Sequence, residues 1–170
     1  NDGAFVRRID LHARDASPAP AAGPIRYAAS VTSDPLGPAP LVYAHRGDRS
    51  RAPDNTIEAF TRAVEAGSDG IELDVRRTAD GVLFLHHDPA VDGLPPFCEL
   101  TWNEVHTADP TIPTLEEGLR SIPPHVAVNV EIKNAIHEPD FDASRSVVEQ
   151  VVALVERADE PARILLSSFD

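Results

Sequence analysis

Two short segments of the sequence, 71–75 and 126–133, alternate polar residues with apolar ones. Successive side chains of a strand point to opposite faces, so each segment predicts a strand with one apolar and one polar face. The polar residues stand toward the carboxyl end of each expected strand, which is the end where barrel enzymes build their active sites. These residues are Glu72 and Asp74 in the first segment, and Asn129, Glu131 and Lys133 in the second.

Three of these side chains are carboxylates, and they would meet on one face of the sheet. Carboxylates held together repel one another and lose hydration, and a bound divalent cation relieves both costs. Ligation by oxygen alone favours a hard ion, so we expect one Mg²⁺ or Ca²⁺ rather than Zn²⁺, held by Glu72, Asp74 and Glu131. The alternative is that these carboxylates are exposed at a sheet edge or form structural ion pairs, for example between Glu131 and Lys133.

Two histidines follow expected strands at the same end of the sheet. His45 and Arg46 come directly after the apolar run 41–44, and His87 follows the expected strand 82–86. A histidine titrates near neutral pH and can act as a general acid or base. An arginine beside it can hold phosphate oxygens with its two-pronged guanidinium group. The alternative for each histidine is a solvated surface residue.

From residue 41 onward, the sequence alternates strands with helices. This pattern predicts a parallel sheet with helices outside it, as in a (β/α)8 TIM-type barrel. A complete barrel takes about 250 residues, so we expect 41–170 to form only its N-terminal half to two-thirds. Asn55 is the expected N-cap of the first helix. The expected strands span 41–44, 71–75, 82–86, 126–133 and 163–167, and the expected helices span 55–66, a short segment from 114, and 141–157.

Residues 1–40 have a different composition, with two stretches rich in proline, alanine and glycine at 17–24 and 34–40. Proline fixes its backbone angle and lacks an N–H donor, so we interpret 1–40 as an extension or linker beside a domain at 41–170. The sequence does not begin with methionine and shows no signal peptide, so the N-terminus looks truncated. The sequence therefore does not indicate whether the protein is cytoplasmic or secreted.

The composition excludes several classes of protein. The 15 basic and 28 acidic residues give a formal net charge of −13, which disfavours nucleic-acid binding. Cys98 is the single cysteine, so the chain has no internal disulfide and no cysteine metal cluster. No apolar run approaches the roughly 18 residues of a membrane span. The oligomeric state is not indicated.

Eight motifs occur in a fixed order along residues 41–170, and together they resemble the glycerophosphodiester phosphodiesterase family. A ninth segment, Ser167 to Phe169, falls where that family has another short motif. The motifs are His45-Arg46-Gly47, Pro53-Asp54-Asn55-Thr56, Ala59-Phe60, Gly67 to Val75, Thr78 to Gly81, His87-Asp88, Ile112 to Glu117, and Glu131-Ile132-Lys133.

The resemblance implies a metal-dependent barrel enzyme that hydrolyses glycerophosphodiesters to sn-glycerol 3-phosphate and an alcohol. By motif position, His45 and His87 would be the general acid and base, and Arg46 and Lys133 would bind the phosphate. The metal would be held by Glu72, Asp74 and Glu131. The first nucleophile would be either water or the neighbouring glycerol hydroxyl, which would give a cyclic phosphate.

The chain departs from the family pattern at three points, and these leave two alternatives open. Asp54 replaces the usual glutamate, the segment between His87 and Ile112 is short, and the later strands of the barrel are absent. The first alternative is a lysophospholipase D or phospholipase-type barrel that acts on lipid phosphodiesters, with an apolar entrance supplied by 94–97. The second is an inactive truncated chain or a binding remnant.

Overall fold

Five strands form one sheet in the computed structural model, which describes residues 41–158 and 161–169. The extension expected at 1–40 lies outside the described residues. Four strands are parallel, in the order β1-β2-β4-β5, and β3 pairs with β2 in the antiparallel direction. The strands are β1 (Tyr43–His45), β2 (Gly70–Arg77), β3 (Leu83–Leu85), β4 (Ala127–Ile132) and β5 (Ile164–Ser167).

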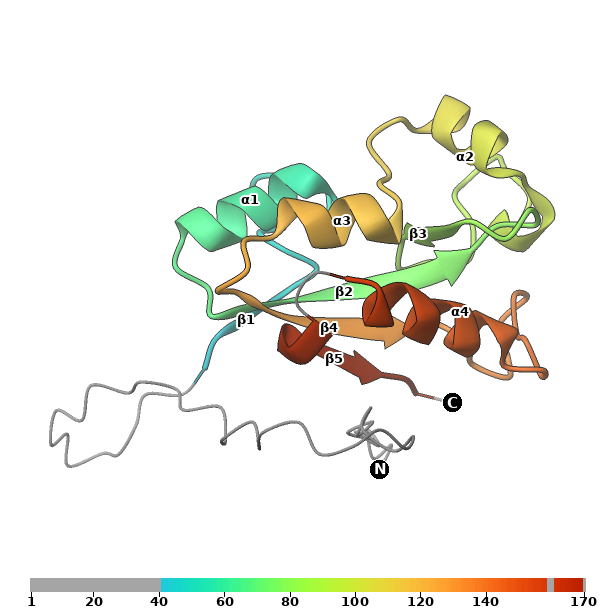
Figure 1. The fold of residues 1–170 in the computed structure, drawn as a ribbon. Helices are drawn as coiled ribbons and strands as arrows, with labels where there is room; N and C mark the ends of the chain where they lie inside the picture. The colour runs from blue at the N-terminus through green and yellow to red at the C-terminus, as the bar shows by residue number, and fades with distance from the viewer. Residues whose placement is uncertain (1–40, 159–160, 170) are drawn as a thin grey trace, which may run out of the picture.

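Three helices cover one face of this sheet, with α1 and α3 side by side and α4 next to them (Figure 1). Their apolar side chains pack against the apolar residues of β2 and β4, which are the odd-numbered residues 71–75 and the even-numbered residues 128–132. Each such side chain contributes about 1.5–3 kcal/mol when fully buried. The helices are α1 (Ile57–Glu65), α2 (Trp102–Ala108), α3 (Leu115–Ser121) and α4 (Ser146–Glu156), with single 3-10 turns η1 (Phe97–Glu99) and η2 (Pro161–Arg163).

Strand β3 is the main difference from the expected parallel sheet. The turn after β2 is tight, because Thr78 donates its backbone N–H to the Val82 carbonyl at 3.0 Å and Gly81 has a φ of 86°. A connection this short can only reverse the chain, since a parallel neighbour needs a crossover of a dozen or more residues. Strand β3 therefore runs back along β2.

One edge of β2 is shared end to end by β1 and β3. Strand β1 pairs with residues 70–72 of β2, and β3 pairs with residues 75–77, while β4 occupies the opposite edge along 70–75. The carboxyl ends of β1 and β3 therefore approach each other along this edge. The consequence is that His45 and the His86-His87 segment reach the same region of the sheet from opposite directions.

Helix α1 is capped one residue later than the sequence predicts. Thr56 is its N-cap, and the Thr56 hydroxyl oxygen accepts a hydrogen bond from the backbone N–H of Ala59 at 3.2 Å. Asn55 instead has a φ of 57°, a left-handed conformation that asparagine tolerates better than most residues. This conformation releases the Asn55 side chain from the helix and lets it reach β2.

Two other helices also differ from the expectation. Helix α2 lies outside the helices that the sequence predicts, and a capping box of Thr101 and Glu104 begins it. Helix α4 starts at Ser146 rather than at 141, since Asp142 accepts the N–H of Val147 at 3.1 Å from outside the helix. Helix α3 begins after Thr114 as expected, and a capping box of Thr114 and Glu117 opens it. Among the described residues, no helix has the length and apolar character needed to cross a bilayer.

Candidate active site

The three predicted carboxylates converge on the face of the sheet opposite the helices. Strand pairing sets Asp74 level with Glu131, and Glu72 is two residues before Asp74 on the same face. One oxygen from each carboxylate lies within 4.8 Å of the others. Asp74 is fully buried, and Glu72 and Glu131 are 9% and 8% exposed. The structure therefore contains the acidic cluster that could hold a metal ion.

Two cationic side chains contact this cluster. Nε of Arg46 lies 3.0 Å from Oδ2 of Asp74, and Nζ of Lys133 lies 2.9 Å from Oδ1 of the same residue. Lys133 also contacts Glu131. Burial disfavours the charge on Lys133, but hydrogen bonds to Glu131 and Asp74 outweigh it and raise the pKa of Lys133. With all three carboxylates ionised, the two cations leave one net negative charge.

Among the three carboxyl groups of the cluster, Glu72 has the pKa that differs most from its ordinary value. Burial raises the pKa of Glu72 to about 7, and the charges of Asp74 and Glu131 add to the effect. Its Oε2 accepts the backbone N–H of Arg46 at 3.2 Å, whereas its buried Oε1 has no hydrogen-bond partner among the described residues. A buried carboxylate oxygen without a partner is costly, and a cation would satisfy it. The donor set therefore fits a hard metal ion.

Asp74 behaves differently because it is surrounded by donors. Burial alone would raise its pKa, but hydrogen bonds from Asn55 and Lys133 and the charge of Arg46 bring the pKa of Asp74 below its ordinary value. Nδ2 of Asn55 donates to Oδ2 of Asp74 at 2.9 Å. Asp74 is therefore ionised at neutral pH, whereas the carboxyl group of Glu72 changes its charge near neutral pH.

His45 is brought to the cluster by strand pairing. It is the last residue of β1, level with Glu72 of β2, and its Nε2 lies 3.8 Å from Oε2 of Glu72. More than half of its side chain is exposed, so the imidazole is open to solvent beside the cluster. Burial and then the neighbouring Arg46 lower the pKa of His45, which favours the neutral imidazole at neutral pH.

His87 lies nearby but does not contact the cluster. It follows β3 by two residues, and its Nδ1 is 2.7 Å from Oδ1 of Asp88. Within 41–158 and 161–169, His87 makes no hydrogen bond or ion pair with the three carboxylates. The preceding His86 donates its backbone N–H to the carbonyl of Asp74 at 3.1 Å, and its ring packs against Phe97. The segment is therefore fixed beside Asp74 through its backbone.

Two further residues of this site are not among those that the sequence predicts. Asn55, interpreted as a helix cap, makes two hydrogen bonds to Asp74. Arg76 lies on the polar face two residues after Asp74 and is 1% exposed. Extending the alternation of β2 by one more step would have indicated Arg76, whereas nothing in the local sequence distinguishes a capping Asn55 from one that reaches a neighbouring strand.

Of the segment 94–97, suggested as an apolar entrance for the lipid alternative, Phe97 is buried and does not line an entrance. Phe97 is 1% exposed and packs edge-on against Phe84, with ring centroids 5.1 Å apart. Leu94 packs against the same small cluster of buried residues. These side chains stabilise the segment that carries η1 and α2.

Residues 45–170 match the model of the glycerophosphoryl diester phosphodiesterase family. The chain belongs to this family. It is 36% identical over 146 residues to a glycerophosphodiester phosphodiesterase of Caldanaerobacter subterraneus, a match that covers 76% of this chain and 58% of that protein. It is also 36% identical over 138 residues to a probable glycerophosphodiester phosphodiesterase 2 of Mycobacterium tuberculosis, covering 76% of this chain and 48% of that one. The chain thus spans about half the length of these curated relatives.

Solved structures of the family confirm the fold. The glycerophosphodiester phosphodiesterase of Thermotoga maritima superposes with a TM-score of 0.65 at 29% identity, over 78% of this chain and 55% of that one. An Oleispira antarctica phosphodiesterase, solved with the product sn-glycerol-3-phosphate, superposes with a TM-score of 0.64 at 25% identity, over 77% and 58% of the two chains. The α/β sheet described here therefore has the fold of part of the TIM-type barrel of these glycerophosphodiester phosphodiesterases.

Proposed function

We propose that this chain carries the catalytic cluster of a phosphodiesterase that hydrolyses glycerophosphodiesters to sn-glycerol 3-phosphate and an alcohol, with one divalent cation, Mg²⁺ or Ca²⁺. The observation that supports this most directly is the buried group of Glu72, Asp74 and Glu131, contacted by Arg46 and Lys133. The product bound to the Oleispira antarctica relative supports the same substrate class.

The charges of the cluster suit a phosphodiester once a cation is present. Glu72, Asp74 and Glu131 would hold the ion, which when bound supplies Lewis-acid polarisation of a phosphoryl oxygen. The two cationic side chains and a divalent ion would together exceed the three carboxylates by one positive charge. A phosphodiester carries one negative charge, so Arg46 and Lys133 would orient a substrate that neutralises the site.

The two histidines would move the protons. The lowered pKa of His45 keeps its imidazole neutral at neutral pH, so it would take a proton from the attacking hydroxyl or water. In His87, Nδ1 contacts the carboxylate of Asp88, which leaves Nε2 to exchange a proton with the substrate. His87 would then protonate the leaving alkoxide, as general acid–base catalysis requires.

Release of sn-glycerol 3-phosphate from glycerophosphocholine tests this function. The assay would be run with Mg²⁺, with Ca²⁺ and with EDTA, on this chain and on any longer product of the same gene. We expect activity that EDTA abolishes and that Glu72→Gln removes. The matched control is Glu116→Gln, because Glu116 lies on α3 with its side chain 67% exposed.

The other outcomes separate the alternatives. Choline release from lysophosphatidylcholine without turnover of glycerophosphocholine would indicate the lysophospholipase D type. Absence of turnover on both substrates, with a folded protein, would indicate an inactive or binding remnant. Full activity in EDTA would overturn the metal role of the carboxylates.

A further inference from the structure

A second charged cluster lies on the same face of the sheet as the carboxylates, at the end of β2. Its centre is Arg76, which is 1% exposed and shares its face with Glu72 and Asp74. Its carboxylate partners are Glu138 and Asp140, whose side chains are 21% and 7% exposed. A guanidinium this deeply buried is kept only where its hydrogen bonds are satisfied.

All five N–H groups of Arg76 have acceptors. Nε and Nη2 both donate to the backbone carbonyl of His87, at 2.8 and 2.5 Å. Nη2 and Nη1 also donate to the two carboxylate oxygens of Glu138, at 2.9 and 3.1 Å. The second Nη1 hydrogen goes to Asp140 at 2.5 Å. This arrangement needs the planar fork of arginine, since a lysine ammonium cannot reproduce it.

These contacts join two segments that flank the candidate active site. His87 follows β3, while Glu138 and Asp140 belong to the loop that follows Lys133 at the end of β4. The same loop contacts the turn η1, where Sγ of Cys98 donates to the carbonyl of Pro139 at 3.7 Å. Arg76 thus connects His87, the proposed general acid, to the loop that follows Lys133, the proposed phosphate ligand.

We propose that Arg76 is a positioning residue for the reaction: it holds the backbone of His87 in place and fixes that segment to the loop 134–142. This inference rests on the proposed function, because it assigns Arg76 an effect on proton transfer by His87. The residue itself does not touch the reacting atoms. Its effect is on the placement of the imidazole, and a small misplacement of a catalytic group costs a large part of its rate.

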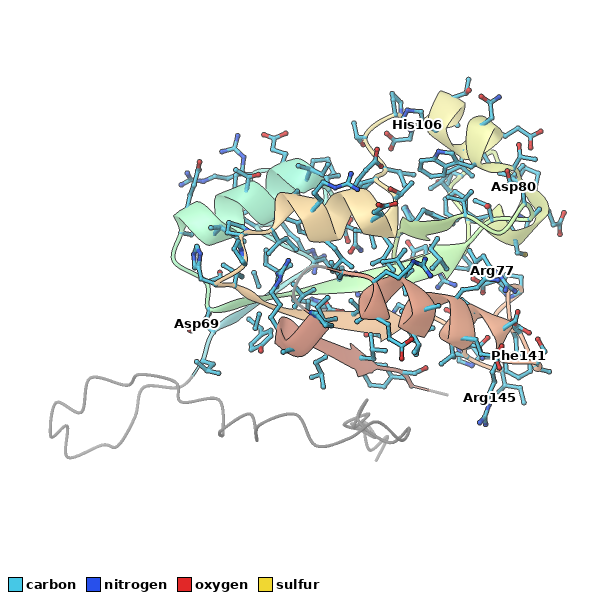
Figure 2. All side chains as sticks on the ribbon, in the orientation of Figure 1. Asp69, Arg77, Asp80, His106, Phe141 and Arg145 are labelled. Carbon is cyan, nitrogen blue, oxygen red and sulfur yellow. The ribbon has the colours of Figure 1, made fainter. Side chains whose placement is uncertain are left out.

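The neighbouring Arg77 provides a matched control. It points to the opposite face of β2 and holds the same loop through Asp142 at 3.1 Å, and it also contacts Ser146, the first residue of α4, at 2.6 Å. Among the described residues, Arg77 makes no hydrogen bond to the His87 segment. Figure 2 shows Arg77 at the end of the molecule where Phe141 of this loop and Arg145, the N-cap of α4, lie. A loss caused only by a loosened loop should therefore appear with both arginines.

The test compares Arg76→Lys with Arg77→Lys in the phosphodiesterase assay, at a temperature where both proteins are folded. We expect Arg76→Lys to lower kcat by about 10–100-fold with little change in KM, since placement of a proton donor matters in the transition state. We expect Arg77→Lys to leave kcat within about twofold of the parent. The decisive measurement is the double variant Arg76→Lys with His87→Ala, which should be no slower than His87→Ala alone, because residues that act as a unit are not additive.

Each other outcome identifies what has failed. An unchanged kcat in Arg76→Lys, equal losses for Arg76→Lys and Arg77→Lys, or additive losses in the double variant would overturn the positioning role. If Arg76→Lys does not fold, Glu138→Gln serves instead, because it removes one charged partner of Arg76 while the contacts to His87 can remain. It should lower kcat by less than Arg76→Lys, with the same lack of additivity with His87→Ala, and additive losses would again overturn the inference. An inactive parent protein would overturn the proposed function instead.

Discussion

The side-chain amide of Asn55 makes two hydrogen bonds to Asp74. Nδ2 donates to Oδ2 at 2.9 Å, and Oδ1 accepts the backbone N–H of Asp74 at 3.0 Å. Asn55 therefore holds both the carboxylate and the backbone of the most buried acid in the cluster. The left-handed backbone at Asn55 makes this reach possible, and asparagine is one of the few residues that adopt this conformation readily.

Replacing Asn55 should weaken both the fold and the acidic cluster. We expect Asn55→Ala to lower the free energy of unfolding by roughly 2–4 kcal/mol, because two buried hydrogen bonds are lost and alanine is strained at this backbone angle. Urea unfolding measures the free energy of unfolding, and a Mg²⁺ titration measures the affinity of the carboxylate cluster for the ion. Asn55→Asp is the sharper variant, since it keeps the shape but adds a negative charge beside Asp74. Wild-type stability in both variants would contradict the role given to Asn55.

Glu72 should make the metal-free protein less stable as the pH rises. A carboxyl whose pKa increases from 4.5 to about 7 on folding binds its proton more tightly in the native state. Its contribution is therefore complete below about pH 4.5 and is lost as the pH rises through 7, and it amounts to about 3 kcal/mol. Denaturant unfolding in EDTA between pH 5 and pH 8 measures this slope against the slope of Glu72→Gln. A difference of the opposite sign would contradict the prediction.

A divalent cation should reverse this trend. Metal binding needs the ionised form of Glu72, so binding releases a proton and strengthens as the pH rises. We expect the increase in Tm caused by Mg²⁺ or Ca²⁺ to be larger at pH 8 than at pH 6, and to be absent in Asp74→Asn. Thermal melts at the two pH values give the result, and an increase in Tm that does not depend on pH would exclude Glu72 from the ligands.

The histidines should differ strongly in their effect on turnover. We expect His45→Ala and His87→Ala each to lower kcat by roughly 10²–10⁴-fold, which is the range for a lost general acid or base. His86→Ala should cost much less, because the His86 ring packs against Phe97 and its contact with Asp74 is made by the backbone. Steady-state kinetics on the three variants decide this. Equal losses for His86 and His87 would mean that the catalytic imidazole is assigned to the wrong residue.

Lys133 should affect the substrate more than the metal. We expect Lys133→Met, which keeps the apolar stem of the side chain, to lower kcat/KM by about 10²–10³-fold, since charge builds on the phosphoryl oxygens in the transition state. Affinity for the divalent cation should stay the same or rise, because a positive charge near Asp74 and Glu131 is removed. A metal titration and a thermal melt complete the test. A destabilised fold with weaker metal binding would instead make Lys133 a structural partner of Glu131.

The sequence was sufficient to predict the polar face, but not all of its contacts. Alternation along β2 and β4 correctly predicted that Glu72, Asp74 and Glu131 share a face, because a strand leaves side chains only two directions. The register that sets Asp74 level with Glu131 joins distant parts of the chain, so it required the structure. The same holds for Arg76, whose partners Glu138 and Asp140 come from a loop without any periodic pattern.

The antiparallel orientation of β3 was predictable from its short turn, although the expectation of a parallel sheet did not take it into account. The turn at Thr78 to Gly81 is too short for a crossover, but the alternation of strands and helices elsewhere favoured a uniformly parallel sheet. The contact of Asn55 with β2 was not predictable from the sequence. Its position before a helix is typical of a cap, and only its left-handed backbone angle in the structure indicates that its side chain reaches Asp74.

The hairpin of β2 and β3 also has a consequence for how the chain acquires this structure. Its paired residues Arg77 and Leu83 are close in sequence, whereas β2 and β4 pair residues as distant as Gly70 and Ala127. Short loops close at a smaller entropic cost, so local pairings can form before distant ones in the folding of a domain. We therefore expect the His87 segment to reach its place beside β2 early in folding, and the β4 residues Glu131 and Lys133 to join it in a later and slower step.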